Sequence, residues 1–237
     1  MLKLELDKRP TKPIIIEGFP GFGFVSTIVT EYLIKHLNAK PIGRITSDKI
    51  SPIAAIHKSQ VIYPLEIFHD PKTNILILQA VTNIDGLEWD IADTILEMAR
   101  ELKAKEIIGL EGVSANMAIQ NPKVFFYSNN EAKTALLKTK KMTLLDEGII
   151  IGVTGALLMK AKEMPLTSFF VEASSNLPDN QAAGKMIEIL NTYLGLNIDT
   201  KPLAQKAKEF EEKIKSIFSK VAEAQVKKDE KKLSYMG

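Results

Sequence analysis

The stretch Pro13-Ile14-Ile15-Ile16-Glu17-Gly18-Phe19-Pro20-Gly21-Phe22-Gly23-Phe24-Val25-Ser26-Thr27 joins an apolar, β-branched run to a glycine-rich turn and then to a segment with helical periodicity. A strand, a glycine-rich turn and a helix in this order hold phosphate groups in many nucleotide-binding proteins, because backbone N–H groups and the positive helix end face the anion. The stretch therefore predicts an α/β fold and raises the question of a phosphate site.

The details of the turn argue against a phosphate site. Its glycine spacing is G-x-x-G-x-G, and the last glycine is not followed by the Lys-Ser or Lys-Thr pair of a phosphate-binding loop. Three large rings, Phe19, Phe22 and Phe24, also occupy it. We interpret the turn as a tight strand-to-helix connection whose glycines serve packing, with an exposed aromatic contact for a partner protein as the alternative.

Outward from this turn, short β-branched runs alternate with helix-period segments, which is typical of α/β layer folds. Runs such as Ile75-Leu76-Ile77-Leu78 are apolar on nearly every residue and indicate a mostly parallel sheet covered on both faces. Strands are expected at 13–16, 41–45, 60–68, 74–79, 106–110, 124–127, 148–153 and 168–173. Helices are expected at 22–37, 89–102, 131–138, 155–161 and 181–194, with Trp89 in the core and Asp179 or Asn180 capping the last of them.

The composition excludes several classes of protein. The 237 residues are 45% hydrophobic and 25% charged, enough to bury a real core. The net charge is +2, but residues 201–237 hold ten Lys and six acidic residues, so the rest of the chain is about −2 and is no obvious nucleic-acid binder. The absence of cysteine excludes disulfides, thiolate zinc sites and a cysteine nucleophile. With no signal-peptide core and no apolar run of membrane-spanning length, we expect a cytoplasmic protein.

The C-terminal segment carries its own pattern. After a boundary at residues 197–202, apolar residues recur at alternating intervals of four and three, which is a heptad seam. The seam residues are Leu203, Ala207, Phe210, Ile214, Ile217, Val221 and Ala224. Such a helix either docks on its own domain or pairs with another subunit, and the narrow seam favours pairing. We expect a core domain at 1–200, an oligomerisation helix at 201–226 and a flexible, partner-binding tail at 227–237.

Polar residues follow two of the expected strands. Glu111 follows one strand, Glu172 and Ser174 lie at the end of another, and Asp179 comes shortly after. Ligands of open α/β sheets bind beyond the carboxyl ends of strands, so these residues are expected around one crevice. They either cap and hydrogen-bond strand ends or serve an enzyme acting on a small nucleoside, phosphate or carboxylate ligand. The three histidines show no metal or catalytic spacing, and no cofactor or metal is expected.

The chain as a whole resembles the proteasome assembly chaperone family, over about residues 12–215. The order and spacing of several motifs carry the resemblance. These are Glu17-Gly18-Phe19-Pro20-Gly21-Phe22-Gly23, Gly109-Leu110-Glu111-Gly112, Gly152-Val153-Thr154-Gly155-Ala156-Leu157-Leu158, Glu172-Ala173 and Pro178-Asp179-Asn180-Gln181-Ala182-Ala183.

The resemblance implies a three-layer αβα sandwich similar to purine nucleoside phosphorylases, used without their chemistry. It implies a homo-oligomer, for example a tetramer, that binds the α subunits of the proteasome 20S core particle without ATP, as assembly chaperone or activator. Partners of the α-ring often end in a hydrophobic-Tyr-X tripeptide. Here Tyr235 is third from the end, where the tripeptide has its tyrosine second. The contact residues expected in this tail are Leu233, Tyr235, Met236 and Gly237.

Overall fold

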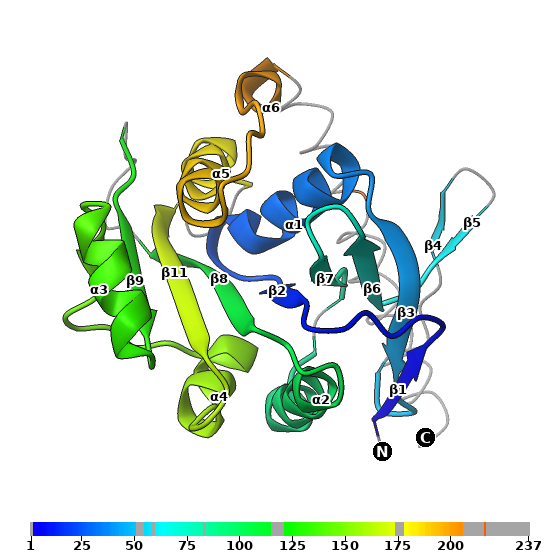
Figure 1. Cartoon of the computed structure of the whole chain (residues 1–237). Coiled ribbons are helices and arrows are strands. Elements are labelled where there is room, and N and C mark those ends of the chain that lie inside the picture. Colours follow the sequence, from blue (N-terminus) through cyan, green and yellow to red (C-terminus); the bar gives the residue numbers. More distant parts are fainter. Residues whose placement is uncertain are drawn as a thin grey trace, which may run out of the picture.

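The computed structural model describes residues 2–50, 55–57, 60–82, 84–114, 121–173, 178–205 and 216. A nine-stranded sheet lies between two layers of helices, which confirms the αβα architecture (Figure 1). The strands are β1 (Lys3–Leu6), β2 (Ile14–Gly18), β3 (Lys40–Thr46), β4 (Ala55–His57), β5 (Gln60–Ile62), β6 (Leu65–Asp70), β7 (Ile75–Ala80), β8 (Glu106–Ser114), β9 (Val124–Ser128), β10 (Thr143–Leu144) and β11 (Leu166–Ala173). The helices are η1 (Phe22–Phe24), α1 (Val25–His36), α2 (Glu88–Glu101), α3 (Glu131–Thr139), α4 (Gly152–Lys160), α5 (Asn180–Leu194) and α6 (Lys201–Gln205).

The centre of the sheet is parallel. The strand order is β1-β3-β6-β7-β2-β8-β11-β9-β10, and the pairs β7–β2, β2–β8 and β8–β11 are all parallel. Antiparallel pairs flank this centre on both sides. β2 lies between β7 and β8, and side chains of helices pack on both of its faces, which explains why Ile14-Ile15-Ile16 is apolar without alternation.

Helices cover the two faces in separate groups. α1, α3 and α5 pack on the face that carries Ile16, while α2 and α4 pack on the face that carries Ile15 (Figure 1). The predicted stripe of α2 is buried, since Ile91, Ile95 and Met98 are fully enclosed. The expectation for Trp89 is wrong: the ring is 49% exposed, with Lys160 Nζ 5.2 Å from its centroid. Within the described ranges, no helix has the length and apolar character needed to cross a membrane.

The glycines of the turn after β2 allow close packing of β2 against α1, as the sequence predicts. A Cβ atom at Gly18 would lie 2.6 Å from Thr30 Cγ2 and 2.8 Å from Ser26 O, so only glycine lets α1 start this close to β2. Gly23 then adopts a left-handed φ of 62° and turns the chain into α1. The strand, the turn and the helix thus form one compact unit.

Two expected strands differ from the structure. The run 148–153 is not a strand: α4 begins at Gly152, where φ is +81°, and Ile149 and Ile151 are 92% and 71% exposed. A short β-branched run alone does not distinguish a strand from an extended loop. The run 60–68 is interrupted at Pro64, which lacks an N–H group for a sheet, so β5 and β6 belong to different sheets.

The start of the C-terminal segment packs on the core. α6 begins at Lys201, where the sequence predicts a new domain, and the division into domains stays a prediction. Leu203 is 1% exposed and belongs to the core cluster beneath α1 and α5. The other seam residues, Ala207, Phe210, Ile214, Ile217, Val221 and Ala224, lie outside the described residues, as do the tail residues Leu233, Tyr235, Met236 and Gly237.

The close approach at Gly18 gives a stability test. Gly18→Ala is expected to lower the free energy of unfolding by about 1–3 kcal/mol, because the new methyl group overlaps Thr30 and the Ser26 carbonyl. Gly184→Ala is the matched control. Its Cβ would lie 3.7 Å from Leu203 Cδ2, inside helix α5, and the change should leave stability equal or raise it by up to about 1 kcal/mol. Chemical denaturation measures both variants, and equal stabilities would contradict the packing role.

Candidate functional site

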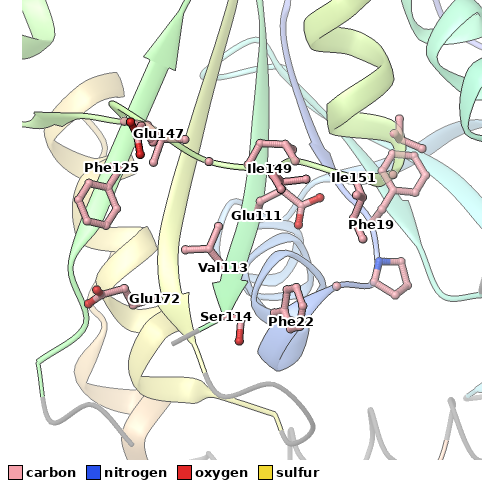
Figure 2. A pocket seen from close by; sticks show the side chains of 18 of the residues that line it. Phe19, Phe22, Glu111, Val113, Ser114, Phe125, Glu147, Ile149, Ile151 and Glu172 are labelled. Atoms are coloured by element: carbon pink, nitrogen blue, oxygen red, sulfur yellow. The ribbon is translucent and has the colours of Figure 1, made fainter. Parts of the chain in front are cut away.

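A pocket of about 1030 Å³ lies beyond the carboxyl ends of the parallel strands (Figure 2). The turn after β2 supplies one wall and the end of β8 supplies the floor. The segment from β10 to the start of α4, residues 143–153, forms the opposite wall, and Glu172 of β11 completes the lining. This is the position at which open α/β sheets bind their ligands, and the cavity has the size of a small-molecule site.

The structure brings together two of the four residues expected at this crevice. Glu111 and Glu172 both line the pocket. Glu172 Oε2 also accepts a hydrogen bond of 2.9 Å from the Lys123 backbone N–H. Asp179 caps α5 by accepting a hydrogen bond of 2.9 Å from Ala182 N–H, as predicted, and it does not line the pocket. Ser174 lies outside the described residues.

A third carboxyl group, missed in the sequence analysis, lies behind Glu111. Glu17 of β2 is fully buried, and Thr154 Oγ1 of α4 lies 2.8 Å from Glu17 Oε1 and 3.1 Å from Glu111 Oε1. The register pairs Glu17 with Gly109 of β8, where a Cβ would lie 2.9 Å from Glu17 Oε1. Glycine therefore leaves the space that the carboxyl group fills. The sequence does contain a signal for Glu17, since it is a single acidic residue near the end of an otherwise apolar strand.

Both carboxyl groups hold protons more tightly than usual. Burial raises the pKa of Glu17 to about 8, although the hydrogen bond from Thr154 favours the ionised form. Burial, and then the neighbouring Glu17, raise the pKa of Glu111 well above its ordinary value. Glu17 Oε2 has no hydrogen-bond partner among the described residues. Glu17 is thus mostly protonated at neutral pH, which makes this buried group tolerable without a cation beside it.

The ionisable side chains that line the described part of the pocket are all acidic. Its described lining contains no Lys, Arg or His, whereas six carboxyl side chains contribute to it: Asp85, Glu88, Glu111, Asp146, Glu147 and Glu172. Like charges in a partly enclosed site repel an anion, so the lining disfavours the phosphate and carboxylate ligands considered from the sequence. In the described part of the chain, no three acidic or histidine side chains gather closely enough to hold a metal ion.

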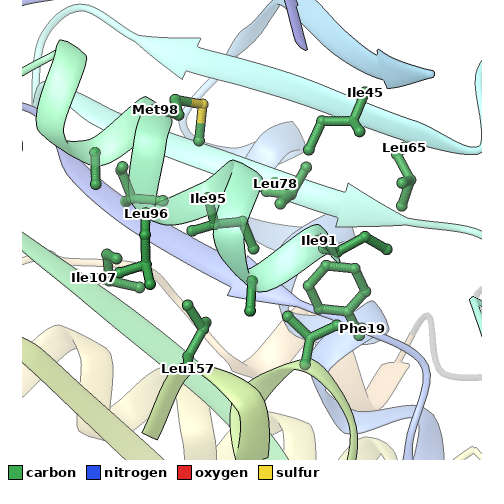
Figure 3. Packing of buried hydrophobic residues seen from close by; sticks show 14 of the residues in the cluster. Phe19, Ile45, Leu65, Leu78, Ile91, Ile95, Leu96, Met98, Ile107 and Leu157 are labelled. Carbon is green, nitrogen blue, oxygen red and sulfur yellow. The ribbon is translucent and has the colours of Figure 1, made fainter. Parts of the chain in front are cut away.

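The rest of the pocket is apolar. Phe19 faces the core, where it packs near Ile91 and Leu157 (Figure 3). Phe19 also contributes to the pocket lining, as does Phe22, three residues later, which is 39% exposed. Ile149 and Ile151 face Phe22 from the opposite wall (Figure 2). The turn thus buries one ring and exposes another, and a partner contact through the exposed ring stays a prediction.

Comparison with known proteins identifies the group to which this fold belongs. The model of the PAC2 family matches residues 15–217. The chain belongs to the PAC2 family. An uncharacterized protein from Methanocaldococcus jannaschii is 29% identical over 210 residues, covering 86% of this chain and 85% of its own length.

Solved structures similar to this PAC2 chain include two from Pyrococcus furiosus. PbaA, an archaeal homolog of proteasome-assembly chaperone, superposes with a TM-score of 0.87 at 28% identity, covering 95% of this chain and all of its own. PbaB, an archaeal proteasome activator, superposes with a TM-score of 0.76 at 25% identity, covering 91% of this chain and 98% of its own.

The buried carboxyl group gives the PAC2 chain a specific pH dependence. Folded Glu17 keeps its proton up to about pH 8, whereas the unfolded residue releases it near the ordinary pKa of 4.5. Stability is therefore lost as the pH rises through this window, by roughly 3–5 kcal/mol in total from this residue. Glu17→Gln keeps an acceptor for Thr154 and does not titrate. The free energy of unfolding of this variant should therefore rise relative to that of the wild type as the pH is raised from 5 to 8.

Denaturant unfolding at several pH values measures this difference. Glu188→Gln is the control, because Glu188 is an exposed residue of α5 paired with Lys185. Its difference from the wild type should stay constant across the same range. A constant difference for Glu17→Gln as well would contradict a protonated, buried Glu17.

Proposed function

We propose that this PAC2 protein is a non-enzymatic, cytoplasmic proteasome-binding protein, acting as an assembly chaperone or as an ATP-independent activator. The observation that supports it is the likeness, over nearly the whole chain, to both PbaA and PbaB. One is a homolog of proteasome-assembly chaperone and the other a proteasome activator, so two relatives of the same fold concern the same large assembly. The proposed role needs binding surfaces and no catalytic group.

The contact we propose lies in the C-terminal tail. Lys227, Lys228, Lys231 and Lys232 precede Leu233, Tyr235, Met236 and Gly237. An apolar tip on a charged segment gains free energy when a pocket buries the tyrosine ring. We place this pocket between α subunits of the 20S core particle.

Oligomerisation makes such a tail effective. Leu203 anchors the start of α6 in the chain's own core, so the proposal assigns pairing between subunits to the following seam residues, from Ala207 to Val221. Several tails held on one homo-oligomer bind with a high effective concentration once the first tail is bound. A weak tail then suffices for tight attachment to a ring that repeats its binding pockets.

Deleting Ser234–Gly237 tests the tail contact. The deletion should abolish capture of the 20S core particle in a native pull-down, because it removes Tyr235, Met236 and Gly237 together. Size-exclusion chromatography with light scattering should show the same oligomer as the full chain. Replacing Lys227 and Lys228 by Ser is the matched control, which should weaken capture only modestly. Unchanged capture by the deleted chain would reject the tail mechanism.

A charge in the seam tests the oligomer. Ile214→Glu should dissociate the assembly, because it places a carboxylate at an apolar seam position. Lys213→Glu introduces the same side chain one position away, outside the seam, and should leave the assembly intact. Light scattering gives the mass of each. The proposal predicts that Ile214→Glu lowers affinity for the core particle at least tenfold through lost avidity; an unaltered mass would contradict pairing through the seam.

A further inference from the structure

The pocket beyond β2 and β8 has no part in the proposed attachment to the proteasome. We propose that it is a binding site for a small organic cation, with an amine or amidine head on an apolar body. The volume of about 1030 Å³ points to a small molecule, since pockets of this size enclose drug-sized ligands. The site goes beyond the proposed function and does not depend on it.

The charges around the cavity select the sign of the ligand. Six carboxyl groups and no basic side chain line its described part, so a cation entering it is attracted from several sides. Glu111 lies at the floor, and Oε2 faces the turn at Gly21, where a Cβ would be 3.0 Å away. Its other oxygen is held by Thr154. Thr154 thus holds one oxygen of Glu111 in place, while the other lies beside the turn at the floor of the cavity.

The walls select the rest of the ligand. Phe22, Phe125, Val113, Ile149 and Ile151 supply rings and branched side chains on the sides of the cavity (Figure 2). Apolar surface of this kind gains free energy from covering a hydrocarbon or aromatic body, and aromatic faces attract an alkylammonium group. A hydrated metal ion would leave these walls uncovered, which is why the occupant we infer is organic.

The carboxyl pair couples binding to protons. Glu17 from β2 lies behind Glu111, and Thr154 of α4 bridges them. The other lining carboxyl groups come from the segment before α2, from the first residue of α2, from the segment before α4 and from β11. The raised pKa of Glu111 favours its protonated form, whereas a cation beside it favours the ionised form. Binding of a cation therefore releases a proton, and the affinity for it rises with pH.

Three indole probes that differ only in their head group test the site on the full chain. Tryptamine carries an ammonium group, tryptophol a hydroxyl group and indole-3-propionate a carboxylate. Isothermal titration calorimetry at pH 7 should give tryptamine at least tenfold tighter binding than tryptophol, because a charge-assisted hydrogen bond contributes about 1.5–3 kcal/mol. Indole-3-propionate should not bind. Repeating the tryptamine titration in buffers with different ionisation heats should reveal proton release.

Two variants assign the effect to Glu111. Glu111→Gln should weaken tryptamine about tenfold or more, leave tryptophol unchanged and remove the proton release. Glu188→Gln, which changes an exposed carboxylate of α5 outside this pocket, should behave as the wild type. The proposal is overturned if the wild type binds none of the probes, if it binds tryptamine and tryptophol equally, or if Glu111→Gln keeps the preference. The comparison of probes on the wild type stands even if Glu111→Gln fails to fold.

Discussion

The centre of the fold encloses a carboxyl group, Glu17, that has no ion-pair partner among the residues that the structure describes. Glu17 is the next-to-last residue of the central strand β2, and the Thr154 hydroxyl links it to Glu111, so one short network ties β2, β8 and α4 together. Glu106, another buried glutamate, is surrounded by donors instead: Lys133, Thr167 and Tyr193 all contact it at 2.5–2.9 Å. Glu106 thus takes part in a structural ion pair, whereas Glu17 is kept neutral by burial behind the pocket residue Glu111.

Much of the fold follows from local signals. The stripe Ile91, Ile95 and Met98 predicts α2 because a buried helix face repeats every three to four residues, and the structure confirms it. The edge strands β1 and β10 were not predicted. β10 has two exposed residues and no apolar pattern, whereas in β1 the alternation of Leu4 and Leu6 with Lys3 and Glu5 was a strand signal that was overlooked. The run 148–153 was wrongly predicted to be a strand because it is rich in isoleucine. In the structure these isoleucines face a pocket and solvent and have no strand partners.

The site was predictable only in part. Glu111 and Glu172 follow from the rule that strand ends meet at one edge of a parallel sheet, and both line the pocket. Glu17 and Thr154 belong to the same site through the register of β2 against β8 and the placement of α4, which depend on tertiary packing. The acidic character of the pocket likewise emerges from segments distant in sequence, and no local motif encodes it.

We propose that the molecule divides its roles between a domain with an acidic pocket and a C-terminal segment that contacts the proteasome. Cryo-electron microscopy of the full chain mixed with archaeal 20S core particles tests this division most directly. The account predicts a complex on the end of the core particle, with density for the C-terminal residues up to Gly237 inserted between α subunits. A complex in which the folded body makes the contact and these residues lie away from the ring would contradict it, as would the absence of a complex.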